Sequence, residues 1–305
     1  MKWIIPVFSS LMVLAPALVA QQTPVSVIVT VEARHGNDVP QLRREDFMAY
    51  QKKDRQRVTQ VLPLQGEHAG LELFLLIDDN SSSSLGSQLE ELRKFVIDQP
   101  ATTNVAVGYM RNATVEIVQN FTADHALAAR KLRLPLSSFG VMSSPWLSVS
   151  DLVKRWPVTP MRRELVLVAS GDDELMGVTG GTNSYLDSAI EAAQRTGTVV
   201  YSIYTPGSGH AGHSMWRMSS AQSHLAQIAE ETGGEAFMLG FGEPVSFKPY
   251  LAEIAERMTH QYRVTVALTP GNKAGLQSVK FATEVPNAEL ISAGRVWVPA
   301  GGNSK

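Results

Sequence analysis

The chain of 305 residues contains no cysteine. This absence excludes a disulfide framework, and it excludes a lipid anchor attached through a cysteine thiol. A domain of this length can bury enough apolar surface to fold without covalent cross-links. Its stability must therefore come from side-chain packing.

The chain also lacks an excess of charge of either sign. Lysine and arginine number 27 against 29 aspartate and glutamate residues, which gives a formal net charge of -2. Nucleic acids and anionic lipid surfaces select strongly basic patches. We therefore expect no nucleic-acid partner.

A long apolar run is missing everywhere except at the start of the chain. Lys2 is followed by an apolar stretch from Trp3 to Leu14 and then by mostly small residues up to Ala20. A membrane span needs about 20 apolar residues, whereas a basic head, a short apolar stretch and small residues are typical of a secretory signal peptide. We expect cleavage near Ala20, export to the periplasm or the cell exterior, and no stable membrane anchor.

Catalytic motifs are scarce as well. The chain has no Gly-x-Ser-x-Gly nucleophile elbow, and its glycine-rich stretch Thr179-Gly180-Gly181-Thr182 lacks the lysine of a phosphate-binding loop. No acid/base pair stands out that hydrolysis would require. We therefore expect a protein that is not an enzyme, with a hydrolase as the least favoured class.

A regular alternation of apolar runs and amphipathic stretches is present from residue 69 to 260. Such alternation is typical of βαβ units and a mostly parallel, doubly wound sheet. The predicted strands are Leu71–Ile77, Asn104–Met110, Glu164–Ala169, Thr198–Tyr204 and Glu235–Met238. The predicted helices are Leu85–Ile97, Tyr185–Arg195, Ala221–Glu231 and Phe247–Met258.

Strand-like patterns flank this α/β region on both sides, in residues 21–68 and 261–305. Val25–Val31 leads the first segment, and Tyr262–Leu268, Ser278–Thr283 and Arg295–Val298 form the second. Neither segment has enough strands to be stable alone. We therefore predict that both chain ends pack together as a small β-sandwich beside the α/β domain.

Oxygen-bearing side chains gather directly after the first predicted strand of the α/β region. The sequence from Asp78 to Ser84 offers two carboxylates and four hydroxyls before the next helix. Ligands of open α/β sheets bind at the carboxyl ends of the strands. Oxygen donors of this kind suit a hard cation such as Mg²⁺.

The run Asp79-Asn80-Ser81-Ser82-Ser83 resembles the Asp-x-Ser-x-Ser signature of von Willebrand factor type A domains. Motifs in the flanks, such as Val29-Thr30-Val31, resemble bacterial secreted proteins related to this family, which are common in Acidobacteria. The resemblance implies a Rossmann-like fold and a metal-ion-dependent adhesion site for Mg²⁺ or Mn²⁺. The implied ligands are Asp79, Ser81 and Ser83, with Asp78 as the alternative to Asp79.

Two further loops of the family contribute to its metal site. The family's threonine corresponds here to Ser143 or Ser144, and Ser170 stands where the family has an aspartate, followed by Asp172 and Asp173. The resemblance implies that these two aspartates could supply the missing carboxylate.

The resemblance also implies a function, which is adhesion-type binding of a protein partner whose Asp or Glu completes the coordination of the cation. The rival hypothesis is an interaction or scaffold domain that has lost the metal. Such a domain would bind through apolar loop residues such as Trp146, Tyr185 or Trp216.

Overall fold

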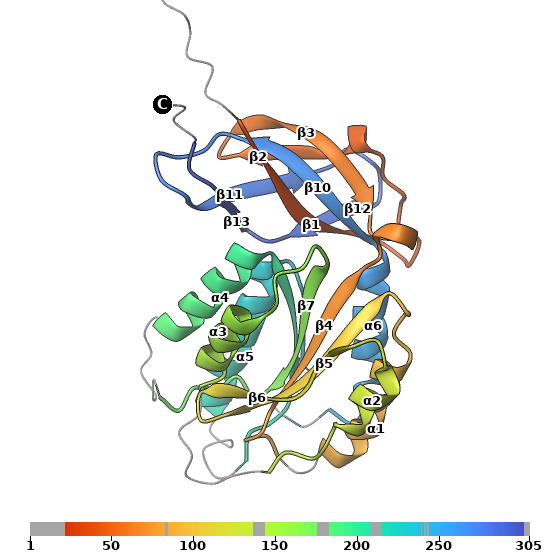
Figure 1. Cartoon of the computed structure of the whole chain (residues 1–305), viewed down its shortest axis with the longest axis vertical. Coiled ribbons are helices and arrows are strands. Elements are labelled where there is room, and N and C mark those ends of the chain that lie inside the picture. The colour runs from red at the N-terminus through yellow and green to blue at the C-terminus, as the bar shows by residue number, and fades with distance from the viewer. Residues whose placement is uncertain are drawn as a thin grey trace, which may run out of the picture.

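The structure, a computed structural model, describes residues 22–82, 85–136, 144–175, 183–208, 215–238, 240, 242 and 244–301. Two sheets lie one above the other (Figure 1). The lower sheet has six strands and is flanked by helices, whereas the upper sheet has seven strands.

The six-stranded sheet has the strand order β6-β5-β4-β7-β8-β9. All neighbouring strands run parallel except β6, which is antiparallel to β5. Every residue of the central strand β4 is buried, as expected for a strand covered on both faces. The strands are β4 (Leu71–Asp78), β5 (Thr103–Arg111), β6 (Thr114–Thr122), β7 (Arg162–Ala169), β8 (Thr198–Tyr204) and β9 (Ala236–Phe237).

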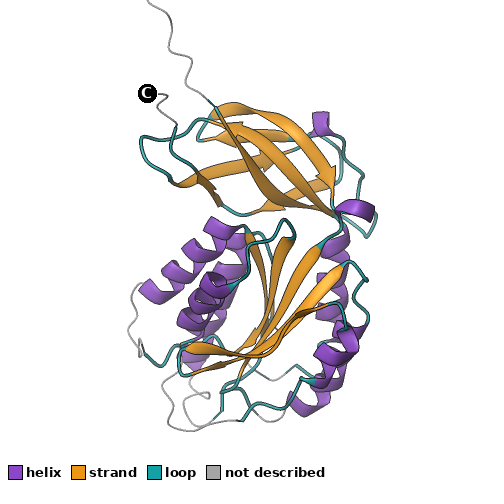
Figure 2. Cartoon of the chain, in the orientation of Figure 1, coloured by secondary structure: helices purple, strands orange, loops and turns teal. Residues whose placement is uncertain are grey.

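Helices cover both faces of this sheet (Figure 2). On one face pack α1 (Gly86–Ile97), α2 (His125–Arg130) and α6 (Lys248–Thr259). On the other face pack α3 (Pro145–Arg155), α4 (Ser184–Thr196) and α5 (Met215–Thr232). The predicted α/β architecture, with a mostly parallel and doubly wound sheet, is therefore confirmed.

The seven-stranded sheet is antiparallel and combines both ends of the chain, in the order β12-β1-β10-β3-β2-β11-β13. Its apolar core includes Val29, Val264 and Val298, each fully buried. The strands are β1 (Thr23–Ala33), β2 (Met48–Gln51), β3 (Asp54–Pro63), β10 (Gln261–Leu268), β11 (Gly275–Ala282), β12 (Ala288–Ser292) and β13 (Arg295–Val298). Two short 3₁₀ helices, η1 (Arg44–Asp46) and η2 (Gly66–His68), lie in its connections.

The predicted β-sandwich is supported only loosely. The strands of the two chain ends come together as one continuous antiparallel sheet. The sheet curls, so that its edge strand β13 also contacts β1. Curling lets one sheet enclose an apolar core that the prediction assigned to two layers.

The two sheets are joined at the amino ends of the parallel strands. The chain enters the lower sheet after β3 and returns through α6 into β10. Arg257 at the end of α6 forms ion pairs with Glu32 of β1 and with Glu235 next to β9. The carboxyl ends of the parallel strands therefore face away from the upper sheet, and their loops are free to form a site (Figure 1).

No helix of the described residues has the length and apolar character that a membrane crossing requires. Residues 1–20, predicted to be a signal peptide, lie outside the described residues. Export therefore stays a prediction.

Candidate functional site

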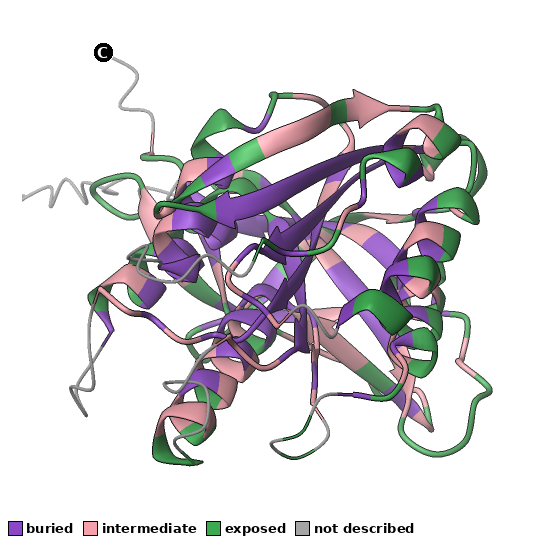
Figure 3. Cartoon of the chain, turned by 90° about the horizontal axis from the view of Figure 1, so that it is seen from below, coloured by how far each residue is buried: buried purple, intermediate pink, exposed green. Residues whose placement is uncertain are grey.

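The loops at the carboxyl edge of the six-stranded sheet form the candidate site, and we call them the loop edge. They comprise residues 79–82, 85, 131–136, 170–175, 205–208 and 244–247, together with the first residues of α3, α4 and α5. Figure 3 views the molecule from below, toward these loops, and shows the buried strands behind them. This is the position at which open α/β sheets bind their ligands.

The loop after β4 is held against the loop after β8. Ser81, which is fully buried, forms an isolated β-bridge with Gly207. The backbone N–H of Ser82 donates to the carbonyl of Pro206 at 3.1 Å. The predicted ligand Ser81 is thus placed at the sheet's carboxyl edge, whereas Ser83 lies outside the described residues.

Asp79, the residue with the strongest predicted metal role, is paired with an arginine. Arg133 Nη1 donates to Asp79 Oδ1 at 2.6 Å, and Nη2 donates to Oδ2 at 3.1 Å. The backbone N–H of Leu136 adds a third donor to Oδ1, at 2.9 Å. Asp79 itself is only 4% exposed. A bidentate arginine–carboxylate pair of this kind is among the strong hydrogen-bonded contacts in proteins.

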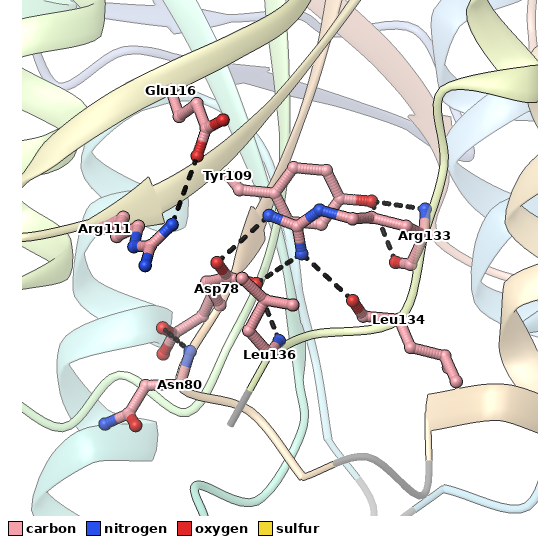
Figure 4. Close-up of polar contacts among 9 residues, drawn as sticks. Asp78, Asn80, Tyr109, Arg111, Glu116, Arg133, Leu134 and Leu136 are labelled. Atoms are coloured by element: carbon pink, nitrogen blue, oxygen red, sulfur yellow. Dashed lines mark hydrogen bonds and ion pairs between the residues drawn. The ribbon is translucent and has the colours of Figure 1, made fainter. Parts of the chain in front are cut away.

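Arg133 is in turn fixed by Tyr109 of β5 (Figure 4). Its guanidinium carbon lies 3.8 Å from the centre of the Tyr109 ring, within the range of a cation–π contact. The Tyr109 hydroxyl accepts from the Arg133 backbone N–H at 2.6 Å and donates to the Arg133 carbonyl at 2.9 Å. The hydrogen bonds to Asp79 raise the pKa of the Arg133 guanidinium further, so that it stays charged.

Asp78, the alternative ligand, is buried at the end of β4. Its Oδ1 accepts from the backbone N–H of Asn80 at 3.0 Å, and its Oδ2 accepts from Ser170 Oγ at 3.4 Å. Burial raises the pKa of the Asp78 carboxyl to about 6. Ser170, which stands at the place of the family's aspartate, therefore acts as a hydrogen-bond donor to Asp78 in this chain.

Asp172 also has a cationic partner. Arg217 of α5 donates to it through Nε at 3.3 Å and through Nη2 at 2.8 Å. The backbone of Gly171 makes this contact possible, because it has φ +74° and an added Cβ would lie 2.6 Å from the carbonyl oxygen of Ala221 in α5. A glycine thus lets the loop after β7 pass directly over α5.

Asp173 and Ser144, two of the predicted ligands, are in contact with each other. Ser144 Oγ donates to Asp173 Oδ2 at 2.9 Å, and Asn183 Nδ2 donates to the same oxygen at 3.3 Å. Ser144 and Asn183 are also the N-caps of α3 and α4. Asp173 therefore joins two helix starts. Ser143 lies outside the described residues.

A small polar cavity lies between these loops. Its volume is about 20 Å³, which is enough for roughly one water molecule. Asn80, Asp172, Glu174 and Arg217 contribute polar atoms to its wall. It offers no space for an organic ligand.

The described residues of the loop edge do not together fit a hexacoordinate Mg²⁺ or Mn²⁺ ion. Such an ion needs several oxygen atoms directed at one point, whereas the carboxylates of Asp79, Asp172 and Asp173 are each directed at nitrogen or hydroxyl donors. No three His, Asp or Glu side chains within the described ranges converge as a metal-binding group.

The apolar residues of the rival hypothesis differ in exposure. Trp146, in the first turn of α3, is fully buried in the core, so the prediction that it forms part of a binding surface is wrong. Tyr185 is half-buried. Trp216 is 54% exposed at the start of α5, and its part in a binding surface stays a prediction.

Sequence reasoning missed Arg133 and several apolar residues at the loop edge. The missed apolar residues are Leu134, Leu136 and Val245, which are all exposed. The sequence carries no motif for them, because each lies in an irregular connection where periodicity gives no signal.

Comparisons with known proteins add likenesses of structure alone. No protein-family model and no curated protein sequence matches the chain. Among solved structures, it is similar to an aerotolerance-related membrane protein from Bacteroides fragilis, with 12% identity, a TM-score of 0.47, and coverage of 62% of this chain and 98% of that one.

Two further similar structures are von Willebrand factor type A domains. The one from Catenulispora acidiphila has 11% identity and a TM-score of 0.47, and the match covers 95% of this chain and 76% of that chain. The domain from SpRpn10 has 11% identity and a TM-score of 0.38, and the match covers 59% of this chain and 93% of that chain. Type A domains are thus among the structures that this chain resembles.

Proposed function

We propose that this chain is a protein-binding module that contacts its partner through the loop edge. One observation carries the proposal. Seven large apolar side chains are exposed among the described residues, and five of them lie at the loop edge. These five are Leu134, Leu136, Met215, Trp216 and Val245.

These five side chains lie in the loops or the first turn of α5 at one edge of the sheet, and exposed apolar surface that is contiguous is typical of interaction sites. Tryptophan is also enriched among the residues that dominate binding energy in protein interfaces. Asp79, Asp172 and Asp173 of the same edge are engaged with Arg133, Arg217 and the helix cap Ser144, respectively. The proposed contact is therefore apolar, and the proposed activity is binding rather than catalysis.

Two parts of the sequence prediction enter this proposal differently. Export stays part of it, because residues 1–20 have the order of a signal peptide. A cation bridge to an acidic partner is less well supported, because Arg133 already pairs with Asp79. The form of the proposal that the geometry favours is binding without a divalent cation.

The test compares the proteins that the tagged wild type and its variants retain from an extract of the source cells. The double variant Leu136→Ser/Trp216→Ser removes two side chains of the loop edge. Val158→Ser is the matched control, because Val158 is 95% exposed but lies at the other edge of the sheet. All three proteins are compared in chelator and in Mg²⁺.

The proposal predicts a protein that the wild type and Val158→Ser retain and the double variant loses, in chelator as well as in Mg²⁺. Equal retention by all three would rule out the loop edge as the binding surface. Retention that requires Mg²⁺ would instead support the cation-bridged form.

A further inference from the structure

The segment 131–136 is attached to the loop edge at several points, although it contains no regular secondary structure after Lys131. Its backbone contacts the Tyr109 hydroxyl through both the N–H and the carbonyl of Arg133. The Arg133 side chain forms the bidentate pair with Asp79, and the backbone N–H of Leu136 donates a hydrogen bond to the same carboxylate. The Asp79 carboxylate thus organises the whole segment.

The Arg133 guanidinium lies where the resemblance would place a cation. Asp79 directly follows β4, as the first ligand of the implied metal site does, and both of its oxygens face the guanidinium. Figure 4 shows the guanidinium stacked on Tyr109 and pointing at the loop after β4. The positive charge at this position is therefore supplied by the chain itself.

We propose that Arg133 is a built-in cation that replaces the divalent ion at Asp79, and that it is a positioning residue for the segment 131–136. The guanidinium satisfies the Asp79 charge without any ligand from solution. By fixing the segment it also presents Leu134 and Leu136, which are 42% and 52% exposed, at the loop edge. This second role rests on the proposed function.

The second arginine–aspartate pair of the loop edge provides a matched control. Arg217 and Asp172 also form a bidentate pair, but both are partly exposed, with side-chain fractions of 21% and 27%. Arg217 belongs to the regular helix α5, so its pair does not anchor an irregular segment. Its removal should leave the segment 131–136 unchanged.

The experiment measures Mn²⁺ binding and thermal melting for the full chain and for Arg133→Ala, Arg133→Lys, Asp79→Ala and Arg217→Ala. The wild type should bind no Mn²⁺ and melt at the same temperature in EDTA and in Mn²⁺. Arg133→Ala should melt lower in EDTA, and Mn²⁺ should raise its melting temperature toward that of the wild type. Asp79→Ala should not respond to Mn²⁺.

Hydrogen exchange provides the second readout, because it reports on the segment directly. The Leu136 amide should exchange at least tenfold faster in Arg133→Ala than in the wild type, and at an intermediate rate in Arg133→Lys, which keeps one charged donor. Arg217→Ala should match the wild type at this amide. Unchanged exchange in Arg133→Ala would overturn the positioning role.

Saturable Mn²⁺ binding by the wild type would overturn the role of Arg133 as a built-in cation. A folded Arg133→Ala protein that gains no stability from Mn²⁺ would also overturn this role. These measurements use the chain without any partner, so their failure is distinct from a failure of the proposed function, which the retention experiment detects.

Discussion

Asp79 and Arg133 form a bidentate ion pair in which the two side chains differ strongly in exposure. The Asp79 side chain is 5% exposed, whereas that of Arg133 is 32% exposed. Removing either partner therefore leaves a charge in a different environment. The aspartate would remain in the protein interior, and the arginine would reach water.

We predict unequal losses of stability from this difference. Arg133→Ala leaves a buried carboxylate without its cation, which costs about 3–5 kcal/mol. Asp79→Asn leaves a guanidinium that water can partly solvate, and we expect a loss of about 1–2 kcal/mol. Urea unfolding at pH 7 in EDTA measures both values, and equal losses would contradict the difference in burial.

Gly171 provides a prediction about the loop after β7. Gly171→Ala places a Cβ in a left-handed conformation and 2.6 Å from a backbone oxygen of α5. The conformation alone costs about 1–3 kcal/mol, and the clash adds to this cost because a backbone atom cannot rotate away. The free energy of unfolding measures the effect.

Gly36→Ala is the control for this substitution. Gly36 has nearly the same φ, +73°, but nothing lies within 4 Å of an added Cβ. The Gly36→Ala protein should therefore lose only the stability that the left-handed conformation costs. A Gly171→Ala protein that is no less stable than Gly36→Ala would disprove the close approach of the loop to α5.

Glu164 on β7 predicts a pH dependence of stability. Burial raises the pKa of this carboxyl, and the nearby Arg162 only partly opposes the rise. Gln261 also opposes the rise, and Arg162 Nε lies 3.6 Å from Glu164 Oε1, too far for an ordinary hydrogen bond. The folded state therefore holds the proton more tightly than the unfolded state does. The resulting contribution of Glu164 to stability is present below the ordinary glutamate pKa and is lost as the pH rises through the raised pKa of the folded state.

Denaturant unfolding of the wild type and Glu164→Gln between pH 4 and pH 8 tests this dependence. The free energy of unfolding of the wild type, relative to the variant, should fall with rising pH. A constant difference across the range would show that Glu164 titrates normally.

The two contacts of Ser144, as the cap of α3 and as a donor to Asp173, lead to a prediction about stability. Ser144→Ala removes the acceptor for the Leu147 N–H and the donor to Asp173. We expect a loss of about 1–2 kcal/mol. Ser188→Ala, which removes an exposed hydroxyl within α4, should change stability little, and a similar loss in both variants would argue against the cap.

The central part of the fold could be predicted from the sequence, because β4, β7 and β8 are nearly continuous apolar runs. The strand β6 was missed. It follows a tight turn through Asn112 and Ala113, both with positive φ, and alanine is not a residue that signals such a turn. A hairpin whose turn contains unusual residues is difficult to predict from the sequence.

The helix α3 was missed for a different reason. The sequence up to Pro145 was assigned to a loop that supplies a metal ligand, and no helix was predicted after it, although the serine and proline at the start of this helix are typical of a helix amino end. Ser144 serves as this cap. A functional interpretation of the serine thus concealed its structural role.

The predicted ligands after β4 lie at the carboxyl edge of the sheet, but the partner of Asp79 was not predicted. The Asp79 carboxylate had a predicted metal role, and its pairing with Arg133 joins segments separated by more than 50 residues. Nothing in the local sequence of either residue indicates the other. Such a contact becomes visible only when the sheet brings β4 and β5 side by side.

The chain leaves the seven-stranded sheet at Pro63 and returns to it at Gln261, and these two points adjoin, since the Leu64 N–H donates to the Gln261 carbonyl at 2.9 Å. The whole α/β part is therefore an insertion at a single place in the upper sheet. Its gain, loss or exchange during evolution would need only one genetic event and would leave the strand order around it intact. During synthesis, by contrast, β1 is made long before its partner strand β10. The upper sheet therefore completes its folding last.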